Sequence, residues 1–235
     1  MRVPASPAGH TAASVRIAGL DLPAPGSYTL DHIMPAPHGA VLDSDGSAHR
    51  LAEFATGKIT VFSFVYTTCS DARGCPLALA TLHTLKAAIG ADPGLRDKVR
   101  LVSMSFDPDY DTPPVMLSYG GADAGAGARP RWHFLTTQSV RQLAPLLDGF
   151  GQDVGMAVED RLDNAGPAAP RAGRGQLSHL LKIYLIDGRG DVREIYSPAF
   201  LQPATMLADI RTLAREARAA GGPTPAAVPA SNAAP

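Results

Sequence analysis

Two runs of mostly apolar residues limit the fold most strongly, because such runs are typical of strands buried on both faces of a sheet. They occupy residues 59–66 and 99–106. Between them, Pro76 opens and Gly90 closes a segment with a broad apolar helical face. Proline at the first helical position and glycine at the end are expected helix boundaries. The three segments predict a strand, a helix and a second buried strand in succession.

The rest of the ordered chain predicts hairpins and helices that complete an α/β sandwich, a central sheet flanked by helices. With two cysteines at the first strand-to-helix junction, this order of elements points to a thioredoxin-like layout. The further elements are a hairpin over residues 40–51, a short helix from Thr112, a strand at 132–135, a helix over 139–147 that Pro145 should kink or restart, a hairpin around 187–190 and a last helix over 204–219.

Composition indicates one domain with two tails. We expect a flexible N-terminal segment over residues 1–37, a thioredoxin-like domain over 38–220 and a disordered C-terminal tail over 221–235, where small residues and prolines dominate. A net charge of −1 argues against nucleic acid as a partner. The sequence has no apolar run long enough to predict a membrane span and no apolar stretch near its start that would indicate a secretory signal.

Cys69 and Cys75, six positions apart in the loop after the first buried strand, are the strongest candidates for chemistry. Cys75 directly precedes Pro76, so the amides and dipole of the helix N-terminus should favour a thiolate. Two thiols on one short loop can close a disulfide or bind one metal ion. Among the seven histidines, His179 stands just before a predicted strand and would complete a three-ligand site. Sulfur ligands select Cu(I), and imidazole also serves Cu(II).

These residues, taken together and in order, resemble the SCO/SenC family of copper-binding assembly factors for cytochrome c oxidase. The resemblance spans most of residues 39–219. Its motifs are VYTTCSD at 65–71 followed by Cys75-Pro76, SFDP at 105–108, DTP at 111–113, WHFLT at 132–136, and His179 five residues before YLID at 184–187. The chain departs from the family in having five residues between its cysteines, where three are usual.

The resemblance implies a thioredoxin-like fold that binds one copper ion, Cu(I) or Cu(II), through Cys69, Cys75 and His179. It also implies a partner, the copper-site subunit of cytochrome c oxidase or another copper or thiol client protein. The expected location is the periplasm, or the outer face of a bacterial cytoplasmic membrane.

Two alternatives keep the same fold and leave open whether the protein is an enzyme. In the first, Cys69 and Cys75 carry out thiol–disulfide exchange on a partner protein. In the second, Cys69 attacks peroxide. The chain does not support the second with the Pro-x-x-x-Thr-x-x-Cys pattern of peroxiredoxins, since residues 62–68 contain no proline.

Overall fold

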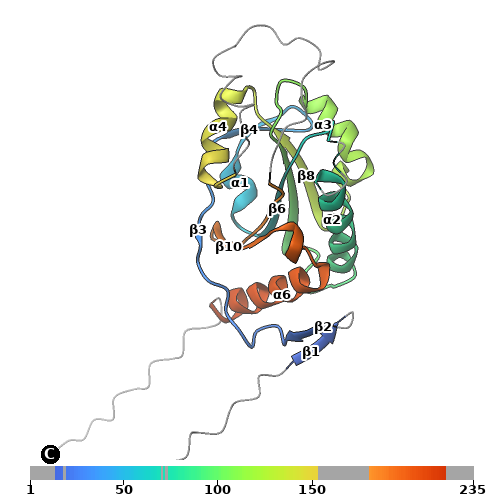
Figure 1. Ribbon diagram of the computed structural model, residues 1–235, viewed down its shortest axis with the longest axis vertical. Coiled ribbons are helices and arrows are strands. Elements are labelled where there is room, and N and C mark those ends of the chain that lie inside the picture. The colour runs from blue at the N-terminus through green and yellow to red at the C-terminus, as the bar shows by residue number, and fades with distance from the viewer. Residues whose placement is uncertain (1–13, 18–19, 70, 72–73, 153–179, 221–235) are drawn as a thin grey trace, which may run out of the picture.

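The computed structural model describes residues 14–17, 20–69, 71, 74–152 and 180–220. Figure 1 shows a central sheet with helices on both of its faces. In chain order the elements are β1 (Ser14–Ile17), β2 (Leu20–Pro23), β3 (Met34–Pro35), β4 (Ala40–Asp43), β5 (Ala48–Arg50), α1 (Leu51–Ala55), β6 (Ile59–Val65), α2 (Cys75–Gly90), β7 (Val99–Ser105), α3 (Pro113–Gly120), a 3₁₀ turn η1 (Gly121–Ala124), β8 (Arg131–Thr136), α4 (Val140–Gly149), β9 (Ile183–Ile186), β10 (Asp191–Tyr196), a 3₁₀ turn η2 (Pro198–Phe200) and α6 (Pro203–Ala220).

The main sheet has eight strands in the order β3-β10-β9-β6-β7-β8-β4-β5. β6 pairs parallel with β7, and β7 pairs parallel with β8, so these strands end at one edge of the sheet. β9 runs antiparallel to β6 with Ile183 opposite Ser63, and therefore begins at the edge where β6 ends. This α/β architecture confirms the predicted sandwich, and the segment after β6 lies where the carboxyl ends of the parallel strands meet.

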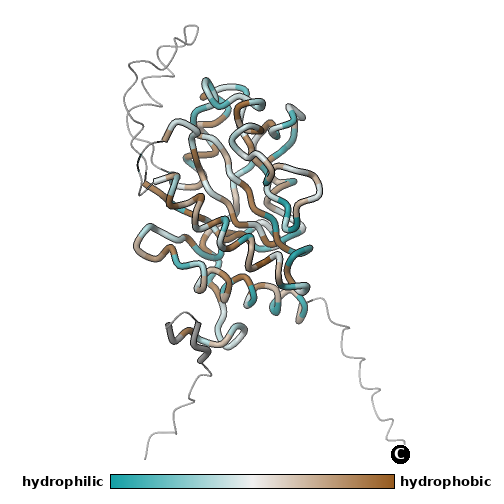
Figure 2. The backbone as a smooth tube through the Cα atoms, turned by 90° about the vertical axis from the view of Figure 1, so that its right-hand side faces the viewer, coloured by the Kyte–Doolittle hydropathy of each residue, from teal (hydrophilic) through white to brown (hydrophobic). Residues whose placement is uncertain are grey.

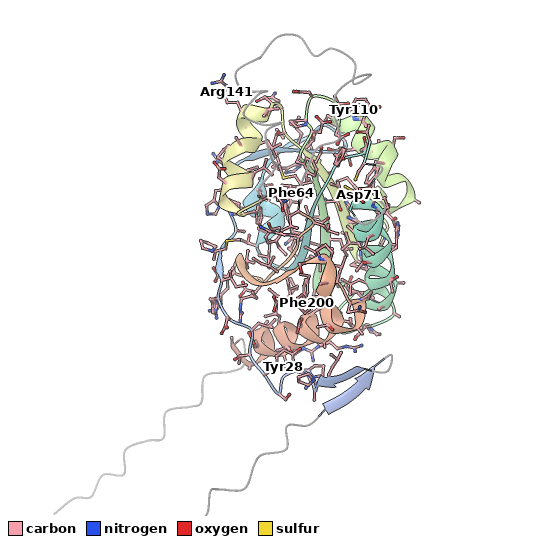
Figure 3. The ribbon with its side chains drawn as sticks, viewed as in Figure 1. Tyr28, Phe64, Asp71, Tyr110, Arg141 and Phe200 are labelled. Atoms are coloured by element: carbon pink, nitrogen blue, oxygen red, sulfur yellow. The ribbon has the colours of Figure 1, made fainter. Side chains whose placement is uncertain are left out.

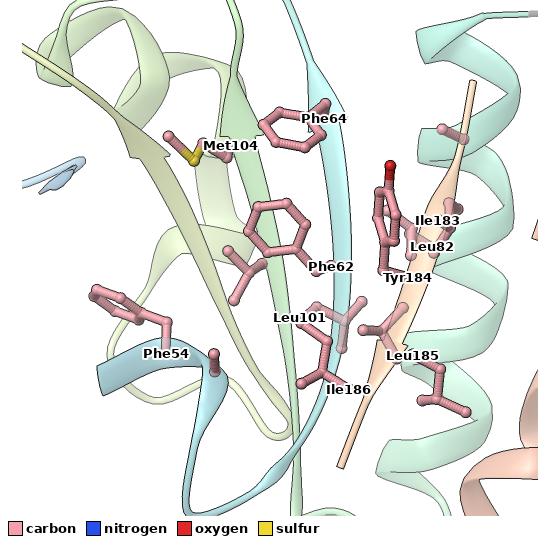
Figure 4. Packing of buried hydrophobic residues seen from close by; sticks show 14 of the residues in the cluster. Phe54, Phe62, Phe64, Leu82, Leu101, Met104, Ile183, Tyr184, Leu185 and Ile186 are labelled. Atoms are coloured by element: carbon pink, nitrogen blue, oxygen red, sulfur yellow. The ribbon is translucent and has the colours of Figure 1, made fainter. Parts of the chain in front are cut away.

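β6 lies at the centre of the core, and all seven of its residues are buried. Phe62 stacks on Phe150 with ring centroids 4.6 Å apart, and Phe150 lies 4.8 Å from the ring of Tyr184. Phe64 packs edge-on against Phe62, and Figure 4 shows both rings on the same side of β6. Burial of such rings supplies the largest apolar contribution per residue to folding. The hydrophobic colour in Figure 2 follows the inner strands.

The opposite face of the sheet, which α2 and α3 cover in Figure 1, carries buried polar groups that are bonded to one another. The Trp132 indole N–H donates to Ser103 Oγ at 3.0 Å, and the Ser63 and Ser103 hydroxyls are 3.0 Å apart. Because each hydroxyl has a partner, the desolvation of these groups is compensated. Ser63 lies on β6 and Ser103 on β7, so the same bonds tie two parallel strands to β8.

The predicted elements appear within a few residues of their expected limits. Pro145 does not restart the helix in which it lies, since α4 continues to Gly149. Its missing N–H leaves the Arg141 carbonyl without its usual donor. Arg141 is exposed in the first turn of α4, where a carbonyl has access to water. The Ser139 side chain caps this helix by accepting from the Gln142 N–H.

Residues 20–37, part of the segment expected to be flexible, contact the body of the protein. The Tyr28 hydroxyl donates to Asp209 at 2.6 Å, and the Gly26 N–H donates to Thr212 Oγ1 at 2.9 Å. Both acceptors lie on α6, and β3 adds a short antiparallel edge to β10. Hydrogen bonds to buried side chains hold this stretch against α6. Composition alone does not indicate such contacts. The C-terminal tail over 221–235 lies outside the described residues. None of the described helices has the length and apolar character that crossing a membrane requires.

Candidate functional site

The two cysteines lie where β6 passes into α2, at the carboxyl edge of the parallel strands. The chain turns directly after β6, with the Cys69 N–H donating to the Tyr66 carbonyl at 3.2 Å. A second turn follows in which the Gly74 N–H donates to the Asp71 carbonyl at 2.9 Å, and Cys75 is the first residue of α2. Figure 3 shows Asp71 beside the start of this helix. One turn therefore ends at Cys69, and the next ends at Gly74, directly before Cys75.

Cys69 and Cys75 are both free thiols, and their side chains are hydrogen-bond partners. They differ in exposure, because Cys69 is half-buried whereas Cys75 is only 2% exposed. Burial raises the pKa of the Cys75 thiol, with the neighbouring Cys69 contributing in the same direction. The sequence predicted a thiolate here from the helix N-terminus. That prediction is wrong for the free protein, since desolvation outweighs the helix dipole at this depth.

Gly74 allows Cys69 to lie close to the helix start. A Cβ added at position 74 would lie 3.4 Å from Cys69 Sγ and 3.3 Å from the Asp71 carbonyl oxygen. The 3.3 Å separation from the turn is tight for a real side chain, and the 3.4 Å separation from the sulfur is at the limit of ordinary contact, so a larger residue here would push first against the turn. The glycine next to Cys75 is thus part of the geometry that brings the two thiols together.

Asp111 fixes the beginning of the cysteine loop. Its buried carboxylate accepts the Thr67 hydroxyl at 2.5 Å, the Thr67 N–H at 3.1 Å and the Ser105 hydroxyl at 2.6 Å. The Asp107 N–H in turn donates to Ser105 Oγ at 2.9 Å. Burial raises the pKa of Asp111 even though these bonds act in the opposite direction. The network joins Thr67, two residues before Cys69, to the end of β7 and the start of α3.

Tyr119 of α3 lies close enough to the site for its ionisation to be affected by the cysteines and Asp111. Burial raises its pKa, and Cys75, Cys69 and Asp111 add smaller effects in the same direction. Its ring packs edge-on against Phe134, with centroids 6.1 Å apart. From the sequence, Asp111 was recognised only as part of the DTP motif, and Tyr119 was assigned no role. For Asp111 the motif was the available signal, whereas no local pattern marks Tyr119.

His179, the predicted third ligand, lies outside the described residues, which resume at Leu180. The chain that follows is well fixed. The Gln152 side-chain amide donates to the Leu180 carbonyl at 2.7 Å, and Lys182 Nζ donates to the Gly151 carbonyl at 2.5 Å. From there it continues into β9, which begins at the edge of the sheet that carries the cysteine loop.

One other set of described side chains has ligand atoms close together, namely His32, Asp187 and Asp191, whose atoms lie within 4.8 Å of one another. Asp187 already receives Arg193 Nη1 at 2.9 Å and two backbone N–H groups, from Arg189 and Asp191. The guanidinium supplies the positive charge there, which disfavours a metal cation. The cysteine pair is therefore the better candidate for soft-metal or redox chemistry.

Comparison with known proteins agrees with the architecture. A family model described as SCO1/SenC matches residues 40–215. No curated protein sequence matches the chain. Among solved structures, Arabidopsis thaliana ScoI with copper bound is 18% identical, with a TM-score of 0.59, covering 77% of this chain and 98% of that one.

Two further solved structures show the same fold. A SCO1/SenC family lipoprotein from Bacillus anthracis is 23% identical, with a TM-score of 0.60 and coverage of 77% and 95%. BsSco, a member of the Sco family of cytochrome c oxidase assembly proteins in which a disulfide switch was identified, is 18% identical, with a TM-score of 0.57 and coverage of 80% and 98%. At these identities the similarity shows the thioredoxin-like fold.

Proposed function

Since the chain belongs to the SCO1/SenC family, we propose that it binds copper and assists in assembling the copper centre of a respiratory cytochrome c oxidase. The contact between the thiols of Cys69 and Cys75 at the carboxyl edge of β6 carries this proposal. Two sulfurs held together on a partly exposed loop are a ligand pair suited to Cu(I). Copper in the Arabidopsis neighbour and the assembly role stated for BsSco support the same reading.

The proposed ligands are Cys69, Cys75 and His179. The two cysteines contribute a contiguous pair of donors, and the path of the chain supports the histidine. Leu180 follows it directly, held by Gln152, at the sheet edge where the cysteine loop begins. Two thiolates and one imidazole would form a three-ligand set suited to copper.

The residues around the thiols have separable roles in this proposal. The copper ion would supply the positive charge that stabilises two adjacent thiolates. Cys75 must lose its proton for this, which burial opposes in the free protein, so binding is coupled to proton release. Asp111 holds Thr67 and hence the start of the loop, and Gly74 leaves space for Cys69. Half-buried Cys69 is the ligand that a partner protein can approach.

The partner that fits this role is the copper-site subunit of the oxidase, or another copper or thiol client. The outer face of the bacterial cytoplasmic membrane, or the periplasm, is the proposed location. Family membership supports it, together with the description of the Bacillus anthracis neighbour as a lipoprotein.

Copper stoichiometry and affinity test the proposal directly. Fully reduced protein would be titrated anaerobically with Cu(I) in competition with a chromogenic chelator, alongside Cys69→Ser, Cys75→Ser and His179→Ala. His38→Ala is the matched control, because His38 is an exposed histidine outside the predicted site. We expect one tight copper ion per chain, weakened in all three ligand variants and unchanged in the control. Undiminished binding by His179→Ala would contradict the three-ligand site.

Thiol–disulfide exchange is the second candidate, favoured by the contact between the two free thiols. In this reaction the Cys69 thiolate attacks a disulfide of the partner and displaces one of its thiols. Cys75 then attacks the mixed disulfide at Cys69, forming the Cys69–Cys75 disulfide and releasing the second thiol of the partner. Two electrons and two protons pass from the protein to its partner, so the reaction balances without another reactant.

The same preparation distinguishes the two functions. Exchange without copper transfer predicts no tight copper binding, a reversible Cys69–Cys75 disulfide in the oxidised protein, and turnover against a protein disulfide. Cys75→Ser should then accumulate the mixed disulfide at Cys69. Failure to form the intramolecular disulfide under mild oxidation would exclude this candidate.

A further inference from the structure

A cavity of about 700 Å³ opens at the end of the molecule opposite the cysteine loop. It lies among the starts of β6 and β7, the turn between β9 and β10, and the last turns of α6, which lies across this end in Figure 1. The Gly57 N–H, before β6, donates to the Gly188 carbonyl in the turn at 2.8 Å, and the Ile59 N–H donates to the Lys98 carbonyl, before β7, at 3.0 Å. Backbone hydrogen bonds thus join both strand starts and the turn. Its volume is in the range typical of small-molecule sites.

A buried ion-pair network fixes one wall of this cavity. Arg193, whose side chain is 7% exposed, donates through Nη1 to Asp187 at 2.9 Å and through Nη2 to Glu216 at 3.0 Å. Its Nε donates to the Asp31 carbonyl at 3.1 Å. Arginine held by two carboxylates and by carbonyl oxygens is rigid. One of the two carboxylate charges is left without compensation, so this wall is preformed and its net charge is negative.

The other cations of the cavity have no such partners. Lys58, Lys98, Arg189 and Arg218 line it and are all exposed, and within the described part of the chain none of them forms an ion pair. The remaining carboxylate of the lining, Asp97, lies 3.5 Å from both Arg96 and Arg129. A positive excess therefore surrounds the opening, although the whole chain has a net charge of −1.

α6 gives the cavity an apolar side. Leu213, Ala214 and Ala217 line it from this helix, whereas Lys58, Lys98 and Arg189 line it from the strand starts and the turn. An apolar side combined with an excess of cations fits a molecule with an organic part and an anionic group. Phosphate matches a group of separate lysine and arginine donors, because it presents several oxygens and up to two charges.

We propose that this cavity binds a small organic phosphate, with the phosphate at Lys58, Lys98, Arg189 and Arg218 and the organic part against α6. The site is distinct from the cysteine pair. β6 runs from Ile59 at the cavity to Val65 at the cysteine edge, and six steps along a strand span about 20 Å. The proposal does not depend on copper binding, so either can fail without the other.

Calorimetric titration of the full chain with adenosine monophosphate in a phosphate-free buffer tests this site. We expect saturable one-to-one binding that weakens as salt is raised, and a higher unfolding temperature with ligand. Adenosine should bind at least tenfold more weakly, since it lacks the charged group, and inorganic phosphate should compete with adenosine monophosphate.

A double variant, Lys58→Gln with Arg189→Gln, should weaken adenosine monophosphate binding at least tenfold while the protein remains folded, because both side chains are exposed. Arg141→Gln is the matched control, since this exposed arginine lies at the opposite end of the molecule (Figure 3). Absence of saturable binding, equal binding of adenosine, or equal weakening by Arg141→Gln would overturn the proposal. Binding to phosphatidylglycerol vesicles without binding of adenosine monophosphate would overturn it in favour of a lipid headgroup.

Discussion

The hydrogen bond between the Thr67 hydroxyl and Asp111 is expected to stabilise both the fold and the position of the cysteine loop. Thr67→Val removes the hydroxyl but keeps the β-branched shape and the Thr67 N–H bond to the same carboxylate. A hydrogen bond to a charged group contributes about 1.5–3 kcal/mol. With Asp111 fully buried, we expect Thr67→Val to lower the free energy of unfolding by about 2 kcal/mol, or ~4–8 °C in melting temperature for a domain of this size.

Asp111→Ala should cost more, because it leaves the Thr67 hydroxyl, the Thr67 N–H and the Ser105 hydroxyl without their acceptor. Because three donors lose their buried acceptor, we expect the free energy of unfolding to fall by about 4 kcal/mol. In the double variant, the two effects should fall short of their sum by about 1–2 kcal/mol, because both remove the same bond.

Urea unfolding of the reduced, metal-free protein followed by circular dichroism measures these values. Thr137→Val is a useful control, since the Thr137 hydroxyl bonds a backbone carbonyl, that of Ser139, outside the network. Purely additive free energies for Thr67→Val and Asp111→Ala would refute the network. So would a loss below about 0.5 kcal/mol for Asp111→Ala, the size expected of a surface substitution.

Two further outcomes concern regions away from the cysteines. Burial raises the pKa of Tyr196 above its ordinary value of 10.0. The contribution of this group to stability is therefore present below pH 10 and declines as the pH rises through the folded value. The free energy of unfolding should differ less between pH 9 and pH 11 in Tyr196→Phe than in the parent protein. Gly120→Ala should lose about 1–3 kcal/mol in urea unfolding despite the better helix propensity of alanine, because its Cβ would lie 2.6 Å from Phe134. Gly127→Ala, with no atom within 4 Å of the added Cβ, should change stability little, and an equal loss there would contradict the steric explanation.

The strands and helices could be predicted because their patterns are local. The β-branched run of β6 and the Pro76 and Gly90 limits of α2 lie within a few residues of the features they mark. The site was harder to predict, because its supporting contacts join distant parts of the chain. Thr67 and Asp111 are 44 positions apart, and no periodicity connects them.

Depth in the fold explains the prediction that failed. The sequence places Cys75 at a helix N-terminus, which predicts a thiolate, but it does not state how deeply the residue is buried. At 2% exposure, desolvation of the charged form controls the pKa of this thiol. The contact between residues 20–37 and α6 was missed for a related reason, since it depends on Tyr28 meeting a buried Asp209 far along the chain.

The two cysteines differ in how accessible their sulfurs are to other molecules. Among the described residues of the site, half-buried Cys69 has the more accessible sulfur, whereas Cys75 is 2% exposed and neighbours Cys69. A second molecule is therefore expected to reach Cys69 before Cys75. A bulky thiol reagent should accordingly modify the protein once and stop, leaving the inner sulfur intact behind the first adduct.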